Sequence, residues 1–596
     1  MKTTYALPVS SQLRPPRLPH ELPPHLRPAR WKIRTKVTEA DRAVAAALGL
    51  SPITAAVLRV RGLEEHEGIL EFLQPTTARL HDPNLLPDCA VAVERLHRAV
   101  TTNESILVFG DYDVDGVTST ALLTRALASL GAKVSWRLPE RKGEGYGLSV
   151  VAIEEAHAAN IKLVVSADCG IRDIEAASRA RELGIDLIIT DHHEPGAELP
   201  QALAVVNPKR ADSVYPFREL SGCGVAFKVL QALIIKHWPR HAASFWDRFV
   251  DLAGMAAIAD CVPLIDENRI LAREGLKQLG ATQKLGLQHL MRVARIDTTR
   301  GLRSSHVGFG LGPRLNAAGR LDSATKSLRL LMSLDDVECA ALAGELEEHN
   351  VVRRELQNRV TDEAVLLASQ QTDLHRDRVL VVAGTGWHGG VMGLVAGRLA
   401  ERYCRPAIVL NIHDGIAHGS GRSAAGFDLH ATIEATRDLL LSGGGHEAAC
   451  GMSLSADNLD EFRERVLRCG QERLQEDDIM PRVEADVEVS GRDLTAKLVD
   501  DLARLEPCGQ GNAEPLFVLR NAKILDGKSM GRTGEHLKWF LDADGARLEA
   551  VWWRPGERAA NFISGTRADI CFAPELNEWN GQTRLQLVVK AARKAD

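Results

Sequence analysis

The stretch Ser105-Ile-Leu-Val-Phe-Gly-Asp-Tyr-Asp-Val-Asp-Gly116 places three aspartates at alternate positions directly after an apolar run. The run predicts a buried strand. If the chain stayed extended, Asp111, Asp113 and Asp115 would share one face, because side chains alternate along a strand. Like charges held so close together repel one another unless a cation lies among them. The stretch therefore favours a divalent-metal site, and an acidic turn is the alternative.

Apolar strand-like runs alternate with helical patterns between about residues 80 and 210. The helical patterns repeat apolar residues every three or four positions, whereas the strand-like runs are continuously apolar. Strand–helix–strand alternation predicts an α/β fold with a parallel, doubly wound sheet. The predicted strands span residues 106–109, 162–166, 187–190 and 204–206, and the predicted helices span residues 119–130 and 174–183.

Polar clusters follow three of these strands, at the edge where such sheets bind ligands. Asp168 follows the second strand, and Asp191-His192-His193 follows the third. With Asp260 they could form a dinuclear site, since carboxylates mixed with imidazole suit Mn²⁺ or Mg²⁺ better than calcium or structural zinc. In such a site Asp191 could orient an imidazole from behind. The histidine pair taken alone could also be a loop pair without a ligand.

Composition limits the class of protein. A chain of 596 residues predicts roughly three to four domains. The net charge of −6 argues against binding nucleic acid through bulk positive charge, although a local basic groove remains compatible with it. The ten cysteines form no C-x-x-C pair, which fits a reducing cytosol. The sequence shows neither a signal peptide nor a membrane-spanning run, so we expect a cytoplasmic protein with no membrane association.

Five regions are predicted along the chain. The first is rich in Pro and Arg and is expected to be disordered. A long uninterrupted helical pattern connects two α/β regions, and short strands with turn signals indicate an OB-like barrel at the end. Tryptophans in that barrel could stack on bases, and core packing is the alternative for each. The regions are residues 1–40 (tail), 41–334 (catalytic domain with an N-terminal helical region), 335–372 (connector helix), 373–475 (second α/β domain) and 480–596 (barrel, with Trp539, Trp552, Trp553 and Trp579).

Four short motifs occur in a fixed order: Gly110-Asp-Tyr-Asp-Val-Asp-Gly116, Ser166-Ala-Asp-Cys-Gly170, Thr190-Asp-His-His-Glu-Pro195 and Ala259-Asp-Cys-Val-Pro-Leu264. They resemble the motifs of the DHH phosphoesterases, and among these most closely the bacterial RecJ single-strand-specific DNA exonucleases. Further similar segments extend the resemblance over about residues 45–596. They are Pro139-Glu-Arg-Lys-Gly-Glu-Gly-Tyr-Gly147, Gly310-Leu-Gly-Pro-Arg-Leu-Asn-Ala-Ala-Gly319, Gly386-Trp-His-Gly-Gly-Val391, Gly421-Arg-Ser423 and Gly443-Gly-Gly-His-Glu-Ala-Ala-Cys-Gly451.

The resemblance implies a fold and a ligand set. The fold would be a doubly wound parallel-sheet DHH domain, a long connecting helix, a second α/β domain of DHHA1 type and an OB-like β-barrel. Asp113 and Asp115 would bind separate metal ions bridged by Asp168. Asp260 and His192 would complete one of the two sites.

The resemblance also implies roles beyond these five ligands. Asp111 would be an additional ligand or a supporting group, since related phosphoesterases carry a histidine ahead of the aspartate pair, where Phe109 stands here. His193 would contact the scissile phosphate, with Asp191 as its catalytic partner. Arg422 lies in a segment that resembles a pocket for a 5′-terminal phosphate. The predicted substrate-binding residues are Arg141, Arg314, Asn316, Arg320, His388, Ser420, Arg422 and His446.

The implied activity is metal-dependent 5′-to-3′ hydrolysis of single-stranded DNA to 5′-mononucleotides, in DNA recombination and repair. Two Mn²⁺ or Mg²⁺ ions would activate water for direct attack. No nucleotide cofactor is expected, because no P-loop is present. The implied partners are single-strand-binding protein and a RecQ-type helicase, for a bacterial protein that works at the nucleoid. The alternatives are a DHH phosphoesterase acting on pyrophosphate, oligoribonucleotides or cyclic dinucleotides, and a non-catalytic single-strand-binding scaffold.

Overall fold

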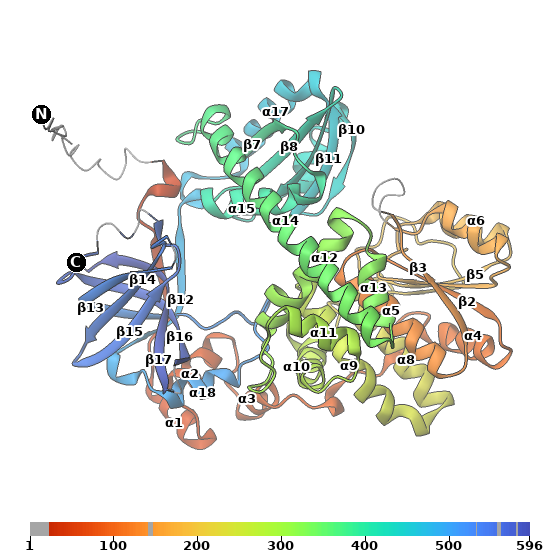
Figure 1. Ribbon diagram of the computed structural model, residues 1–596, viewed down its shortest axis with the longest axis horizontal. Coiled ribbons are helices and arrows are strands. Elements are labelled where there is room, and N and C mark those ends of the chain that lie inside the picture. The colour runs from red at the N-terminus through yellow and green to blue at the C-terminus, as the bar shows by residue number, and fades with distance from the viewer. Residues whose placement is uncertain are drawn as a thin grey trace, which may run out of the picture. The chain divides into compact units, whose positions relative to one another are not determined.

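The computed structural model describes residues 23–140, 147–531, 533–556, 559, 562–579 and 582–595. The chain divides into two compact units (Figure 1). One comprises Ile33–Arg354 with Ala485–Asp596, and the other comprises Met1–Lys32 with Glu355–Glu484. Each unit is described by itself.

The first unit contains a five-stranded, wholly parallel sheet with the order β3-β2-β4-β5-β6. This confirms the predicted doubly wound sheet. The sequence pattern missed β3, because this edge strand alternates exposed and half-buried residues instead of being continuously apolar. The strands are β2 (Ser105–Gly110), β3 (Lys133–Arg137), β4 (Leu163–Ala167), β5 (Asp186–Thr190) and β6 (Ala204–Val206).

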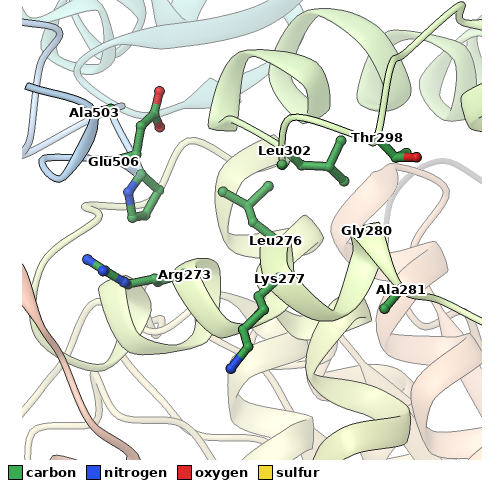
Figure 2. A pocket seen from close by; sticks show the side chains of 11 residues that line it. Arg273, Leu276, Lys277, Gly280, Ala281, Thr298, Leu302, Ala503 and Glu506 are labelled. Atoms are coloured by element: carbon green, nitrogen blue, oxygen red, sulfur yellow. The ribbon is translucent and has the colours of Figure 1, made fainter. Parts of the chain in front are cut away.

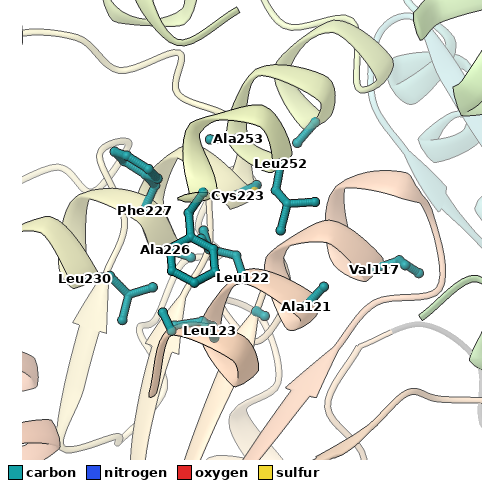
Figure 3. Close-up of a cluster of buried hydrophobic side chains, with 14 of the residues drawn as sticks. Val117, Ala121, Leu122, Leu123, Cys223, Ala226, Phe227, Leu230, Leu252 and Ala253 are labelled. Atoms are coloured by element: carbon teal, nitrogen blue, oxygen red, sulfur yellow. The ribbon is translucent and has the colours of Figure 1, made fainter. Parts of the chain in front are cut away.

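Helices cover both faces of this sheet. Ile106 and Val108 of β2 belong to one hydrophobic cluster, whereas Leu107 and Phe109 belong to another, as strand alternation requires. The first cluster includes residues of α4, α5, α8 and α9, and Figure 3 shows side chains of this cluster from three of these helices, Leu122, Phe227 and Leu252 among them. The second includes residues of α6 and α7. The helices are α4 (Cys89–Thr101), α5 (Val114–Ser129), α6 (Val150–Ala158), α7 (Ile174–Glu182), α8 (Gly222–His237) and α9 (Ala242–Ala259).

A helical region follows the sheet. It includes a π-helix, His306–Leu311, which runs directly into α12 (Gly312–Leu321). The predicted connector is the single helix α14 (Asp336–Gln371), whose residues belong to both units. The other helices are α10 (Asp266–Gly280), α11 (Leu285–Val293) and α13 (Thr325–Met332).

The C-terminal region forms the predicted OB-like barrel. The strand order is β1-β12-β13-β14-β15-β17-β16, and β16 returns to pair with β13, which closes a ring of five strands. Closure removes the exposed edges of a sheet. Trp539 and Trp552 are buried in the barrel core, while Trp553 is 53% exposed. The side chain of Trp579 lies outside the described residues. The elements are β12 (Arg482–Val489), α18 (Ala496–Ala503), β13 (Phe517–Met530), β14 (His536–Ala543), β15 (Ala546–Trp552), β16 (Arg567–Trp579) and β17 (Gln582–Lys594).

The N-terminal region differs from the prediction in two ways. The expected tail of residues 1–40 contains strand β1 (Arg30–Thr35), which joins the barrel sheet beside β12, where an edge strand satisfies its backbone groups by pairing. Residues 1–22 lie outside the described residues. The following helices were assigned to the catalytic domain, but they contribute to the hydrophobic core of the barrel, because an amphipathic helix does not specify its partner. They are α1 (Glu39–Leu48), α2 (Pro52–Val60) and α3 (His66–Leu73). The last of them also contacts the catalytic domain, where Arg269 of α10 donates a 2.9 Å hydrogen bond to the Phe72 carbonyl.

The second unit contains a mixed five-stranded sheet with the order β10-β11-β9-β8-β7. Only β7 and β8 pair in parallel, so the predicted α/β start is followed by antiparallel strands. One face packs against α15 and the C-terminal part of α14, and the other packs against α16 and α17. The elements are β7 (Leu380–Thr385), α15 (Met392–Tyr403), β8 (Ala407–His413), β9 (Ile416–Arg422), α16 (Leu429–Glu434), β10 (Leu440–Gly445), β11 (Ala449–Ser455) and α17 (Leu459–Arg473).

Within the described residues, no single helix is long and apolar enough to cross a membrane. In the same residues, one pair of helices, Glu39–Leu48 and Pro52–Val60, is together long and apolar enough, and its two helices are bent by 110° relative to each other.

Candidate metal centre and substrate-binding residues

The aspartate triplet does not continue the strand. β2 ends at Gly110, and Asp113 is the N-cap of α5, where its side chain accepts a 3.0 Å hydrogen bond from the Gly116 N–H. A Cβ atom on Gly116 would lie 2.6 Å from the Cβ of Asp111, so only glycine fits beside this carboxylate. The expectation of one strand face is therefore wrong, because capping the helix turns the chain.

Asp115 lies in the first turn of α5 and faces the N-terminus of α8. The Gly222 N–H donates to Oδ2 at 2.7 Å, and the Cys223 N–H donates to Oδ1 at 2.8 Å. Unpaired N–H groups and the helix dipole make a helix N-terminus a favourable place for a carboxylate. Burial and the neighbouring Asp113 nevertheless raise the pKa of Asp115 to about 7.

Asp168 follows β4 with a left-handed backbone, φ 64°. Its N–H donates a 2.9 Å hydrogen bond to the Thr190 carbonyl, which ties the ends of two neighbouring strands together. The side chain is almost completely buried. Burial, followed by the charges of Asp115 and Asp113, raises the pKa of Asp168 well above its ordinary value.

The two histidines after β5 have different environments. Burial, followed by the charge of His193, lowers the pKa of His192 to about 3, so this imidazole is neutral and can act as a ligand. His193 Nδ1 lies 2.7 Å from Asp191 Oδ1. Burial opposes the charged form of His193, but this hydrogen bond raises its pKa above the ordinary value.

Asp191 holds the histidine loop in place. Its carboxylate accepts hydrogen bonds from the backbone N–H groups of Ile171, His192 and His193 as well as from the His193 ring. Although burial raises the pKa of this carboxyl group, the His193 hydrogen bond and charge bring it below the ordinary value. The arrangement fixes the position of both imidazoles relative to β5.

The structure brings all six predicted ligands together. His192 Nε2 lies 3.2 Å from Asp168 Oδ1, 3.6 Å from Asp260 Oδ2 and 3.8 Å from Asp115 Oδ2. Among the described residues, three groups at this centre each keep their ligand atoms within 4.8 Å of one another. Asp115, His192 and Asp260 form one, Asp111, Asp113 and Asp168 form the second, and Asp168, His192 and His193 form the third.

This donor set fits two divalent cations. Buried carboxylates that raise one another's pKa need positive charge among them. His192 Nε2 is buried and has no hydrogen-bond partner within the described part of the chain, as expected of a ligand atom without its ion. Oxygen ligands with one neutral imidazole suit Mn²⁺ or Mg²⁺.

Helix α12 packs against the metal centre and explains part of one predicted substrate-binding segment. Asn316 Oδ1 accepts a 3.1 Å hydrogen bond from the Val114 N–H at the start of α5. A Cβ atom on Gly319 would lie 2.8 Å from the Tyr112 carbonyl oxygen. The segment thus positions the aspartate loop.

The three arginines of the first unit that were predicted to bind substrate differ in their surroundings. Arg314 pairs with Glu347, donates to the Gly310 carbonyl at 2.7 Å and has a side chain only 11% exposed, so we do not carry its substrate-binding role forward. Arg320 is half-buried at the end of α12. Arg141 lies outside the described residues.

Two pockets occur in the first unit. One, of about 220 Å³, adjoins the aspartate loop and is lined by Tyr112, Pro139, Glu140, Gly319 and residues 321–324. The other, of about 420 Å³, contains none of the predicted ligands (Figure 2). It lies between α10, residues 298–302 and the barrel segment that includes Glu506 and Pro507.

The remaining substrate-binding candidates belong to the second unit. Arg422 ends β9, and its guanidinium lies over Gly393 in the first turn of α15, where a Cβ atom would be 2.9 Å from Nη2. Burial lowers the pKa of Arg422, and no described carboxylate forms an ion pair with it. Ser420 lies two residues earlier on the same strand.

The two histidine candidates of this unit lie in turns around Arg422. His388 precedes α15, and its Nδ1 accepts a 3.1 Å hydrogen bond from the Gly390 N–H. The His446 N–H donates to the carbonyl of Ala449, which pairs with Arg422 across β9 and β11. A helix N-terminus beside a half-buried arginine is suited to bind a phosphate.

Sequence reasoning missed the residues that hold Asp115. Gly222 and Cys223 supply both hydrogen bonds and follow Ser221, the N-cap of α8. The signal was Ser221-Gly-Cys-Gly before an apolar helical run, a typical helix start. It predicts a helix N-terminus without indicating which acid lies against it.

A parallel sheet with carboxylates and histidines at its strand ends, followed by a second α/β domain and a barrel, defines a DHH-type phosphoesterase architecture. The chain matches the DHH family, N-terminal domain, over residues 105–258, the DHHA1 domain over residues 376–472 and the RecJ OB domain over residues 485–591.

The relatives narrow this class to one family. The single-stranded-DNA-specific exonuclease RecJ of Bacillus subtilis is 37% identical over 94% of this chain and 70% of its own length. That of Dickeya dadantii is 34% identical over 93% of this chain and 99% of its own. The crystal structure of RecJ from Thermus thermophilus in complex with Mn²⁺ superposes with a TM-score of 0.81, at 30% identity over 95% of this chain and 80% of that one. The chain belongs to the RecJ family of single-stranded-DNA-specific exonucleases.

Proposed function

We propose that this protein hydrolyses single-stranded DNA from its 5′ end, releases 5′-mononucleotides and requires Mn²⁺ or Mg²⁺. The observation that carries the proposal is the cluster of buried aspartates around His192 in a chain of the RecJ family. RecJ from Thermus thermophilus has been solved in complex with Mn²⁺ and with Mg²⁺. The reaction would serve DNA recombination and repair.

Residue roles follow from two of the ligand groups. Asp115, His192 and Asp260 would hold one ion, Asp111 and Asp113 the other, and Asp168 would bridge them, since its Oδ1 is 3.2 Å from His192 Nε2. Bound ions of this kind activate water and neutralise charge on the phosphate during hydrolysis. The backbone of Gly222 and Cys223 keeps Asp115 in place.

His193 and Asp191 would act together on the substrate. Asp191 would hold a proton at Nδ1 of His193, and their hydrogen bond raises the pKa of the imidazole, which favours its charged form. A fixed cation beside the scissile phosphate stabilises the negative charge that grows on the phosphate oxygens in the transition state. In the second unit, Arg422 with Ser420, His388 and His446 would bind a 5′-terminal phosphate.

The expected partners remain part of this proposal. A nuclease that trims single strands needs a source of them, which fits a RecQ-type helicase, and it meets strands coated with single-strand-binding protein. Both would act with this protein at the bacterial nucleoid in the cytoplasm.

A nuclease assay tests the function. Single- and double-stranded DNA of one sequence, labelled either at the 5′ or at the 3′ end, are incubated with Mn²⁺, Mg²⁺ or EDTA. We expect mononucleotides from the single strand only, with the 5′ label released first, and none in EDTA. Cleavage of dinucleotides but not of long strands would instead support a small-substrate phosphoesterase, and metal-independent binding without cleavage would support a scaffold.

A further inference from the structure

Phe309 is a phenylalanine that the fold leaves in solvent. It exposes 86% of its surface and lies between Gly308 and Gly310 in the π-helix His306–Leu311. Burying such a side chain would stabilise the fold by about 1.5–3 kcal/mol, and this position forgoes that gain. π-Helical segments are rare and occur frequently at functional sites.

The π-helix is anchored to the metal centre. It runs directly into α12. In α12, Asn316 accepts a hydrogen bond from the Val114 N–H, and Gly319 packs against the Tyr112 carbonyl. Phe309 and Asn316 are seven positions apart, a distance on the order of 10 Å along a helix. Phe309 is therefore held at a short and fixed distance from the aspartate loop.

The chain just before the π-helix contacts the barrel. Arg300 forms an ion pair with Glu578 of β16, and Ser304 Oγ donates a 2.9 Å hydrogen bond to Glu506. The pocket of Figure 2 lies at this same junction. Phe309 thus projects from a segment that connects the metal centre with the barrel.

Exposed positive charge accompanies this aromatic ring. Arg295 and Arg303 are exposed, and the charge of Arg303 acts on the carboxyl group of Glu575 in the barrel. Arg295 precedes Ile296, whose side chain packs at Gly310, so this arginine lies on the chain beside Phe309. An exposed aromatic face next to exposed arginines suits single-stranded nucleic acid, whose bases stack and whose phosphates attract cations.

We infer that Phe309 stacks on a base of the DNA strand that enters the metal centre, with Arg295 on an adjacent phosphate. The inference rests on the proposed function and adds a positioning residue to it. The contact favours single strands, because the bases of a duplex are already stacked on one another and cannot take up the ring. It is tolerant of sequence, because every base has a π-face.

The test compares Phe309→Ala, Phe309→Leu and Phe309→Trp with the unaltered full-length chain. KM and kcat are measured for Mn²⁺-dependent release of nucleotides from a 20-nucleotide single strand and from a dinucleotide too short to reach Phe309. Loss of one base stack should raise KM for the long strand about 5- to 100-fold with kcat little changed. Tryptophan should restore KM, whereas leucine, apolar but without a ring, should not.

The controls separate this inference from the proposed function. Ile235→Ala removes another exposed apolar side chain, near the far end of α8, and should leave KM unchanged. If the unaltered chain releases nothing from either substrate, the proposed function fails. If the chain is active but Phe309→Ala has the same KM on the long strand, or loses equal activity on the dinucleotide, base stacking by Phe309 is refuted.

Discussion

Gly222 lies against Asp168 so closely that a Cβ atom on the glycine would stand 2.3 Å from the aspartate Oδ1. The N–H of the same glycine donates to Asp115 Oδ2 at 2.7 Å. One residue therefore contacts two of the carboxylates that we assign to the metal centre. Any side chain at this position must displace Asp168 or the start of α8.

Gly222→Ala should weaken metal binding and catalysis, because the added methyl group must displace Asp168 or the start of α8. Residues that orient metal ligands typically contribute about 10- to 100-fold to metal affinity or activity. We expect a change of that size in the Kd for Mn²⁺, measured by calorimetry, and in kcat on single-stranded DNA.

Gly344→Ala is the matched control for this variant. Gly344 lies in α14, and no atom lies within 4 Å of the position that its Cβ would take. Alanine there should leave activity unchanged and stabilise the helix by up to about 1 kcal/mol. Equal activity of the two alanine variants would show that the Asp168 carboxylate does not need its observed position.

Asp168→Asn should preserve the stability of the metal-free chain and reduce the stabilisation that Mn²⁺ provides. Without metal, the pKa of Asp168 is raised, so its free energy contribution is favourable at low pH and is lost as pH rises through the folded-state pKa. In EDTA at pH 8 the asparagine variant should therefore unfold at a temperature at least as high as the unaltered chain. Mn²⁺ at about 100 times its Kd should stabilise the unaltered chain by about 2.7 kcal/mol and the variant by much less.

Asp460→Asn controls for the loss of a charge, because the Asp460 side chain is 95% exposed. Its unfolding temperature should respond to Mn²⁺ as that of the unaltered chain does. A full Mn²⁺ response in Asp168→Asn would contradict the bridging role.

Much of the fold could be predicted from the sequence, because continuous apolar runs and helical spacing identify buried parallel strands and their crossover helices. The position of Asp168, His192 and their neighbours at one sheet edge follows from that topology alone. The turn at Asp113 could not be inferred from alternation, since helix capping competes with the extended chain.

Sequence patterns could not predict contacts between residues that are far apart in the chain. Asp115 is held by Gly222, 107 positions later in the chain, and nothing local to either residue indicates the other. Residue type likewise does not reveal whether a side chain faces the substrate or the rest of the fold. Arg314 and Asn316 are two positions apart in one motif, and both make contacts inside the fold. Only the packing of the folded chain determines whether such a side chain is available to bind substrate.

Arg422→Ala should reduce the preference for a 5′-phosphate. A charge-assisted hydrogen bond to a phosphate contributes about 1.5–3 kcal/mol, so KM for a 5′-phosphorylated strand should rise about 10- to 100-fold. KM for a 5′-hydroxyl strand should change far less. Arg468→Ala, at an exposed position of α17, is the control and should change neither value. A uniform effect of Arg422→Ala on both strands would exclude recognition of the terminal phosphate.

His25 should make the packing of the segment before β1 sensitive to acid. Its ring packs edge-on against the Tyr403 ring, with 4.7 Å between the ring centroids. Burial, followed by the charges of Arg405 and Arg402, lowers the pKa of His25 from 6.5 to about 4. Because the folded-state pKa lies below the unfolded value, the contribution to stability is complete above pH 6.5 and declines as pH falls towards 4. Amide hydrogen exchange at Leu26 and Arg27, whose N–H groups donate to the carbonyls of Pro23 and Pro24, should therefore accelerate between pH 6.5 and 4.5 once it is corrected for the intrinsic rate. His25→Phe should remove this dependence, whereas His430→Phe, at an exposed position of α16, should retain it. Equal acid sensitivity of both variants would show that another group controls the segment.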